Sequence, residues 1–293
     1  MSNFLLFTDS SADLPYTYID EHDIHSVNLS YVYGGKEYID DFGKTDGYKS
    51  LYDNLRSGGT STTSQINVNS FVDKLSPHLE AGSDILYLAF SSNLSGTCGS
   101  AMVAKDILTE KYPDARLIVV DTLSASMGQG MLVHYAREMR DQGKSLEETA
   151  AWVEDNKLKM NHWFTVATLE HLKRGGRVSG ASALIASVLE IKPIMCVDDN
   201  GKLIARSKTI GRKKSLKGIV ERLAEKIIDP SNQVIGISHG DCLDDATKVK
   251  AMIESKITPL GFIINNVGPV IGSHSGPGTM AIFFLGKPRE GEN

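Results

Sequence analysis

The sequence predicts an α/β protein of two domains: an N-terminal three-layer domain with a parallel four-stranded sheet, and a C-terminal two-layer domain with a mixed six-stranded sheet. The chain has 293 residues, which is long for a single core and natural for two. Strand patterns alternate with helical patterns through the first half, as in a parallel sheet covered on both faces. From Phe164 onward the strand patterns are denser. The boundary is expected near Asn161, between residues 1–160 and 161–293.

Four apolar stretches in the first half are expected to be strands, at residues 4–7, 25–33, 84–90 and 116–120. Helices are expected at residues 16–21, 47–56, 67–75, 100–112, 125–141 and from 145 to about 160. Pro77 should end or kink the third helix, and Gly143 should end the fifth. Ser145 and Glu148 form a capping-box pattern for the sixth. Residues 58–65 are expected to be a polar loop.

The second half contains six candidate strands, at residues 164–167, 194–197, 203–208, 234–238, 262–267 and 279–285. Residues 198–201 have the composition of a hairpin turn, so part of this sheet should be antiparallel. Helices are expected at residues 181–189, 215–228 and 244–256. The first of these is almost wholly apolar, and two interpretations stay open: a buried core helix, or a wall for a long apolar ligand.

Hydroxyl-rich turns follow three strands of the first half, at residues 8–15, 91–97 and 121–124. Ligands of α/β sheets lie beyond the carboxyl ends of the strands, so these turns could share one crevice. The second turn carries four hydroxyl side chains: Ser91, Ser92, Ser95 and Thr97. It precedes a helix, where backbone N–H groups and the helix dipole favour an anion. A simple helix cap is the alternative, but it needs one hydroxyl rather than four.

Composition argues against several classes of protein. A net charge of -5 and a pI of about 5.9 leave no basic excess for binding nucleic acid. Cys98, Cys196 and Cys242 have no metal-binding spacing, so free thiols, a reducing compartment and no metal site are expected. The apolar start reaches Asp9 too soon for a signal peptide, and no apolar run could span a bilayer, so a cytoplasmic protein is expected. No glycine-rich loop stands between a strand and a helix, so no nucleotide cofactor is expected.

His274 differs from the other seven histidines because glycines, serines and a proline surround it and offer little bulk for packing. A ligand contact is therefore the favoured interpretation, since imidazole can donate to a carboxylate or titrate beside a phosphate. Arg177 follows two glycines just before a predicted helix start. For Arg177, contact with a phosphate or carboxylate and a solvated surface position are equally open.

Seven segments form an ordered set that covers nearly the whole chain: TDSSADLP at 8–15, TSQ at 63–65, SSNLSGT at 91–97, DT at 121–122, GGR at 175–177, KPI at 192–194 and GPVIGSHSGPG at 268–278. Together they resemble the DegV family. Two departures from the family pattern stand out. Ile66 replaces a common proline, and Cys98-Gly99 replaces the usual Tyr-Gln. Both are expected to alter the fit of a pocket more than its chemistry.

The resemblance implies a protein that encloses one long-chain fatty acid, with the head group at the domain crevice and the tail inside the second domain. It implies that Thr63 and Ser95 hold the carboxylate and that His274 lies nearby. The implied ligand-binding set is Thr63, Ser64, Ser95, Gly96, Thr97, His274, Ser275 and Gly276. Arg177 and Arg206 are implied to serve partner docking or phosphate contact.

The resemblance further implies a lipid-binding carrier with no turnover of its own, which presents the acid to a partner fatty acid kinase. The kinase would supply ATP and magnesium, and this chain would carry off the acyl phosphate for phospholipid metabolism, with transient membrane contact. Two alternatives stay open. A stand-alone serine-dependent hydrolase of acyl esters would use a serine of residues 91–95, with His274 as its base. A regulatory protein acting by contact alone would keep an empty pocket.

Overall fold

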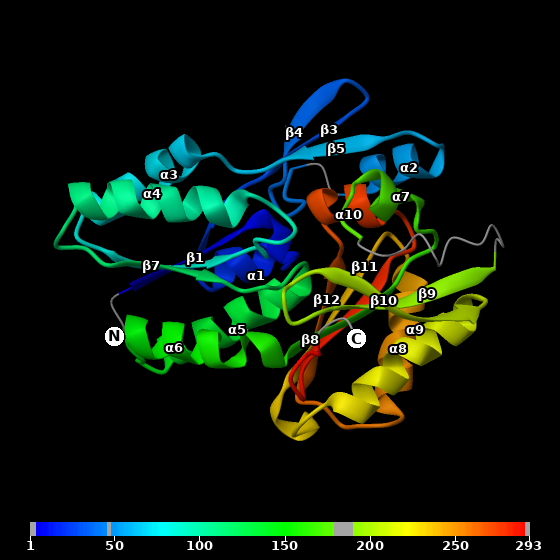
Figure 1. Ribbon diagram of the computed structural model, residues 1–293. Helices are drawn as coiled ribbons and strands as arrows, with labels where there is room; N and C mark the ends of the chain where they lie inside the picture. The colour runs from blue at the N-terminus through cyan, green and yellow to red at the C-terminus, as the bar shows by residue number, and fades with distance from the viewer. Residues whose placement is uncertain (1–3, 46–47, 179–189, 291–293) are drawn as a thin grey trace.

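The computed structural model describes residues 4–45, 48–178 and 190–290. Figure 1 shows two large sheets, the first with helices on both sides and the second with helices along one side. The chain completes the first sheet before it enters the second. The predicted helix at residues 181–189 lies outside the described residues.

The N-terminal sheet has four parallel strands in the order β2-β1-β6-β7. They are β1 (Phe4–Asp9), β2 (Ile24–Val27), β6 (Asp84–Ala89) and β7 (Leu117–Asp121). The helices on one face are α3 (Val68–Glu80) and α4 (Thr97–Lys111), and those on the other are α1 (Tyr16–Glu21), α5 (Met127–Asp141) and α6 (Leu146–Asn156). Successive residues of β1 supply both cores, since Phe7 packs toward α3 and α4 and Leu6 toward α5 and α6. The predicted three-layer arrangement is confirmed.

The C-terminal sheet has six strands in the order β10-β9-β8-β13-β11-β12, with β11 and β12 parallel and the other neighbours antiparallel. They are β8 (Met160–Thr165), β9 (Ile191–Val197), β10 (Leu203–Ile210), β11 (Val234–His239), β12 (Gly261–Asn266) and β13 (Met280–Leu285). The predicted mixed sheet and the hairpin turn between β9 and β10 are confirmed.

The two faces of the C-terminal sheet have different neighbours. One face packs on α8 (Arg212–Lys226) and α9 (Leu243–Glu254), and Ile282 and Phe284 of β13 belong to that core. Ala281 and Phe283 point to the opposite face, because side chains alternate along a strand. There they join Met131 of α5. Helix α5 therefore packs against strands of both sheets and links them.

A third, smaller sheet of three antiparallel strands is a feature that the sequence reading missed. It consists of β3 (Ser30–Tyr33), β4 (Lys36–Ile39) and β5 (Ser61–Ser64), with α2 (Lys49–Arg56) packed beside it. The prediction of one strand over residues 25–33 was wrong, because the Leu29 N–H donates to Ser10 Oγ at 3.0 Å and the chain leaves the first sheet there. The loop predicted at residues 58–65 contains β5, and threonine fits such a pleated strand well.

Helix α3 continues past Pro77, where it was expected to kink or end. Proline has no N–H, so it leaves one backbone carbonyl of the preceding turn without its helical partner. Both Pro77 and Asp73, the residue that carries that carbonyl, are exposed, so water can replace the missing donor. The buried side chain of Leu79 holds the last turn against the core. The helix therefore tolerates this proline.

The capping box at the start of α6 is confirmed. Ser145 Oγ accepts a hydrogen bond from the Glu148 N–H at 3.1 Å, and Glu148 Oε2 accepts one from the Ser145 N–H at 2.8 Å. The helix ends at Asn156, earlier than expected. Two short helices were not expected: α7 (Glu170–Arg174) and α10 (Pro269–Ser275). Among the residues that the structure describes, no helix combines the length and apolar character needed to cross a bilayer.

Candidate functional site

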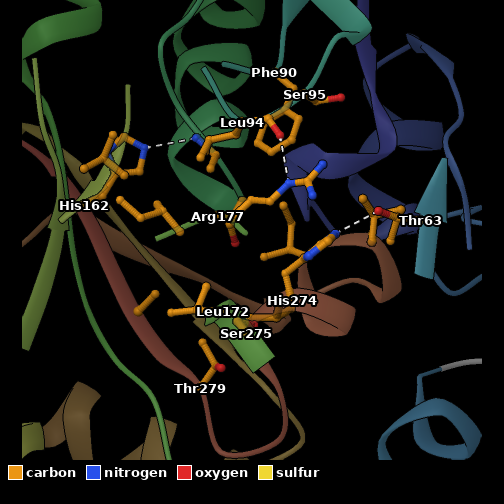
Figure 2. A pocket seen from close by; sticks show the side chains of 18 of the residues that line it. Thr63, Phe90, Leu94, Ser95, His162, Leu172, Arg177, His274, Ser275 and Thr279 are labelled. Carbon is orange, nitrogen blue, oxygen red and sulfur yellow. Dashed lines mark hydrogen bonds between the residues drawn. The ribbon is translucent and has the colours of Figure 1, made fainter. Parts of the chain in front are cut away.

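A cavity of about 440 Å³ lies between β5, α10, the turn after β6 and the open face of the C-terminal sheet. Figure 2 shows side chains from distant parts of the chain around this space. Most polar lining residues come from the first three elements: Thr63, Ser64, Gln65, Ser95, His274 and Ser275. The C-terminal sheet and α7 supply apolar lining residues: Phe164, Leu172, Val197, Leu203, Ala281 and Phe283. Further apolar lining residues come from other segments: Leu29, Phe90, Leu94, Ala125, Val267, Val270 and Ile271. The cavity therefore offers a polar region and an apolar region to one ligand.

Thr63 and His274 meet in the polar region although 211 residues separate them. Thr63 stands on β5, and His274 is in the last turn of α10. Thr63 Oγ1 lies 2.8 Å from His274 Nε2, as the dashed line in Figure 2 marks. The small sheet thus brings one hydroxyl to the imidazole that the sequence reading had favoured as a ligand contact.

The imidazole of His274 is neutral at neutral pH. Burial lowers the pKa of His274 to about 4, and the positive charge of Arg177 contributes to the same shift. Its Nδ1 is buried and has no hydrogen-bond partner among the described residues. A side chain at Gly175 would collide with this ring. A neutral imidazole can donate one hydrogen bond to an anion without carrying a charge itself.

Ser95 reaches the cavity from the turn that precedes α4. Its Oγ lies 2.9 Å from Thr97 Oγ1 and also accepts a hydrogen bond from the Thr97 N–H at 3.2 Å. Thr97 itself is fully buried, and its Oγ1 accepts a hydrogen bond from the Ile66 N–H at 3.3 Å. Gly96 lines the cavity, and the Gln65 side chain occupies the place where a Cβ at Gly96 would stand. Thr97 therefore fixes the turn to residues 65–66 through hydrogen bonds of its buried hydroxyl.

Three residues of the predicted ligand-binding set remain: Ser64, Ser275 and Gly276. Ser64 and Ser275 line the cavity, and Ser275 Oγ is buried with no hydrogen-bond partner among the described residues. Gly276 follows α10 with a φ of 79°, and the ring of His171 fills the space where its Cβ would be. Gly276 thus ends the helix that carries His274 and packs behind it.

The two arginines that the sequence reading paired are separated. Arg177 is exposed and lines the cavity, where its guanidinium donates to the Leu94 carbonyl at 3.3 Å and to the Gly175 carbonyl. Arg206 is on β10 and lines a different pocket, where its Nη2 donates to the Glu290 carbonyl at 2.7 Å. Only Arg177 of this pair is placed to meet a ligand of the first cavity.

Of the three polar turns expected to share one crevice, only the second supplies residues that line the cavity. Ser95 and Gly96 of the second turn line the cavity. The predicted third turn, residues 121–124, does not line it, but the next two residues, Ala125 and Ser126, do. The first turn is buried instead. Asp9 accepts hydrogen bonds from the Tyr87 hydroxyl at 2.8 Å and the Phe90 N–H at 3.0 Å, and burial raises its pKa. This carboxylate holds the ends of β1 and β6 together, so the first turn supports the site without reaching it.

Sequence reasoning missed His162, which lines the cavity on β8. Its Nδ1 donates to the Met160 carbonyl at 2.9 Å, and its Nε2 accepts from the Ala125 N–H at 3.4 Å. Burial lowers the pKa of His162 well below its usual value, so this ring is neutral as well. The signal that could have found it is its register: His162 pairs with Phe283 across the sheet, so both side chains share the cavity face.

Among the described residues, the hydrogen bonds of His274, Ser91 and Ser95 do not join the histidine to either serine. The hydrogen bond that the structure gives His274 goes to Thr63, and the hydroxyl of Ser95 pairs with Thr97. The Ser91 hydroxyl is buried and donates to the Gly201 carbonyl at 2.9 Å. Within residues 4–45, 48–178 and 190–290, no three His, Cys, Asp or Glu side chains are grouped to hold a metal ion.

Comparisons with known proteins place these observations in a family. The family model described as "Uncharacterised protein, DegV family" matches residues 3–287. A DegV domain-containing protein of Clostridium perfringens is 46% identical over 290 residues, which are 99% of this chain and 100% of the relative. One from Streptococcus pyogenes is 37% identical over 284 residues, with 97% and 98% covered.

Solved structures that are similar to this chain also come from DegV proteins. A DegV lipid binding protein from Thermotoga maritima has a TM-score of 0.86 and 28% identity, with 99% of this chain and 100% of that chain covered. A DegV family protein from Thermus thermophilus, whose structure is described as showing fatty acid binding, has a TM-score of 0.84 and 31% identity, with 96% and 98% covered. The fatty acid binding protein DegV from Bacillus subtilis has a TM-score of 0.82 and 27% identity, with 98% and 100% covered. With its fold, its cavity and these matches in agreement, this chain belongs to the DegV family.

Proposed function

We propose that this protein binds one long-chain fatty acid in the cavity of about 440 Å³. The carboxylate would lie at Thr63, Ser95 and His274, and the acyl chain would lie within residues 161–293. The observation that carries the proposal is one largely apolar cavity in which the Thr63 hydroxyl meets the His274 imidazole and the Ser95 hydroxyl lines the same space. Relatives from Thermus thermophilus and Bacillus subtilis described as fatty acid binding support it.

The energetics suit an amphiphile. Burying a chain of about sixteen carbons yields roughly 12 kcal/mol gross, at ~0.8 kcal/mol per methylene. Loss of translational freedom and ordering of the chain reduce that figure. The carboxylate gives up its water and needs donors in return, and Thr63, Ser95 and His274 can supply them. The polar groups of the cavity would therefore set the orientation of the fatty acid. Its apolar wall would supply most of the binding affinity.

The direct test is mass spectrometry of the purified and denatured protein, followed by titration of delipidated protein with oleate. We expect a bound acyl chain or saturable uptake of one oleate per protein. Protein that contains no acyl ligand and takes up no oleate would refute the proposal. Ester hydrolysis by the wild-type protein that disappears in Ser95→Ala would instead support the stand-alone hydrolase.

We further propose that the chain acts as a carrier, which presents its fatty acid to a partner kinase and carries off the acyl phosphate for phospholipid metabolism. Arg177 is the residue that we assign to partner docking or phosphate contact. It is exposed, lines the cavity and contributes to the lowered pKa of His274, so its charge acts at the head group.

Arg177→Ala should therefore weaken kinase-dependent phosphorylation more than fatty acid binding. The assay adds a fatty acid kinase catalytic subunit, ATP and magnesium to the oleate-loaded protein. Arg174→Ala, at an exposed arginine of α7, is the matched control and should leave both readouts unchanged. Equal losses of phosphorylation and oleate binding in Arg177→Ala would mean that this arginine holds the carboxylate.

A further inference from the structure

A second pocket, which we call the rear pocket, has a volume of about 190 Å³ and is lined by residues of β8, β9, β10, α8 and the segment after β13. Among the described residues, four cationic side chains line it: Arg206 of β10, Arg222 and Lys226 of α8, and Arg289 after β13. Glu290 is the carboxylate among its described lining residues. The pocket therefore has an excess of positive charge in a protein whose net charge is -5.

Several contacts hold these cations around the pocket. Arg222 and Lys226 are four residues apart on α8 and so lie on the same side of the helix. The guanidinium of Arg222 stacks over Trp163, 5.6 Å from the ring centroid, and its Nη1 pairs with the Glu225 carboxylate at 2.8 Å. Lys226 pairs with the Glu290 carboxylate at 2.9 Å, and Arg206 donates to the Glu290 carbonyl at 2.7 Å. A ligand would therefore meet side chains that are already positioned.

Arg289 is the buried member of the group, with 7% of its surface exposed. It donates to the Leu123 carbonyl at 2.8 Å and to the Lys157 carbonyl at 3.0 Å. Its Nε is buried and has no hydrogen-bond acceptor among the described residues, although the carboxylates of Asp198, Asp199 and Asp121 attract its charge from a distance. Burial lowers the pKa of Arg289 to about 10. A buried cation without a paired anion is costly, and an anionic ligand in the rear pocket would offset that cost.

We propose that the rear pocket binds a phosphate group, either free or carried by a lipid headgroup. Guanidinium groups match phosphate oxygens in geometry, and a phosphate near pH 7 carries enough charge to meet several cations at once. A volume of about 190 Å³ is far above the ~10–15 Å³ that one water needs, so a tetrahedral anion fits. The residues involved are separate from Thr63, Ser95 and His274, so the proposal does not depend on fatty acid binding.

The test is calorimetric titration of the full chain with inorganic phosphate, matched in ionic strength with sodium chloride. Wild-type protein should bind phosphate saturably. The double variant Arg222→Gln with Lys226→Gln should bind it at least about tenfold more weakly, because two charge-assisted contacts are lost. Lys213→Gln with Lys217→Gln removes the same charge at the same spacing from exposed positions of α8 and should bind as the wild type does.

A spectroscopic readout covers the case in which the double variant folds poorly. Trp152→Phe leaves Trp163 as the single indole, and phosphate bound at Arg222 should change its fluorescence. Vesicles of phosphatidic acid distinguish the two sources: competition with free phosphate indicates a lipid headgroup, and no competition indicates a soluble phosphate. Absence of saturable phosphate binding, or equal binding by the Arg222→Gln, Lys226→Gln protein, would overturn the proposal. Oleate affinity should be unchanged in that protein, so this proposal and the fatty acid proposal can fail separately.

Discussion

The two large sheets of this protein use their faces differently. Helices cover the N-terminal sheet on both faces, and both faces of β1 supply hydrophobic core. The C-terminal sheet has α8 and α9 on one face, and its other face contributes part of the cavity wall. Ile282 and Ala281 are adjacent, yet Ile282 packs under helices and Ala281 lines the cavity. An apolar strand residue can therefore contribute to the hydrophobic core or to the cavity wall. The face of the sheet to which its side chain points determines which.

The largest expected effect comes from filling the cavity at Ala281. This residue pairs with Phe164 across the sheet, and both line the cavity. A phenyl ring in Ala281→Phe would displace about four methylenes of a ligand, so oleate affinity should fall by about 100-fold or more, at ~0.8 kcal/mol each. Fluorescence titration measures the loss.

The neighbouring position gives the control for that change. Ile282→Val should lower the free energy of unfolding by about 1 kcal/mol and leave oleate affinity unchanged. Normal oleate binding by Ala281→Phe would show that the two faces are not divided as described.

The next effect concerns the contact that joins the two halves. Asp13 is buried, and its carboxylate accepts hydrogen bonds from the Gly268 N–H at 2.9 Å and from the Ser126 hydroxyl. Burial raises the pKa of Asp13 from 3.8 to about 7. Between these values the folded protein binds more protons than the unfolded chain, so the contribution of Asp13 to stability falls as pH rises.

Asp13→Asn removes this titration. Relative to the variant, wild-type protein should lose up to about 4 kcal/mol of unfolding free energy between pH 4 and pH 7, at 1.36 kcal/mol per pKa unit. His134 and His274, whose pKa values burial lowers to about 4, act in the opposite direction in both proteins and cancel in the difference. Denaturant unfolding across this range gives the curve. Parallel curves for wild type and Asp13→Asn would contradict the assignment.

A smaller effect is expected at the polar end of the cavity. Thr63→Val keeps the shape of the side chain and removes the hydroxyl that meets His274. Oleate affinity should fall by about fivefold, roughly 1 kcal/mol for one hydrogen bond, whereas methyl oleate should lose less. Thr62→Val, whose side chain alternates to the other side of β5, is the matched control. Equal losses for the acid and the ester would show that Thr63 does not contact the carboxylate.

The smallest effect tests whether binding and stability separate in the N-terminal half. Ser145→Ala removes the capping box of α6, far from the lining residues in sequence. The free energy of unfolding should fall by about 1 kcal/mol, and oleate affinity should stay at the wild-type value. Thermal unfolding with and without oleate measures both quantities. A weaker affinity would mean that the N-terminal layers tune the cavity.

Much of the fold could be predicted from local patterns, because strands such as β6 and helices such as α5 carry their own periodicity. The capping box of Ser145 and Glu148 and the turn before β10 are also local signals. The small sheet could not be predicted in this way, since β5 is short, polar and paired with a distant strand.

The candidate site was predictable only in part. The family motifs pointed to Thr63, Ser95 and His274. In the structure, Thr63 Oγ1 lies 2.8 Å from His274 Nε2. No local pattern encodes a contact across 211 residues. The cavity wall was harder still, because Phe283 looks like any core residue until its register against His162 is known.

His162 and Val197 line both the cavity and the rear pocket, so an occupant of either would contact the same two residues. If an occupant of one pocket moves these side chains, the shape of the other pocket changes as well. Thermodynamic reciprocity then requires that each guest alter the affinity for the other by the same factor. Through these two shared side chains, a bound lipid would change the affinity for an anion, and a bound anion would change the affinity for a lipid.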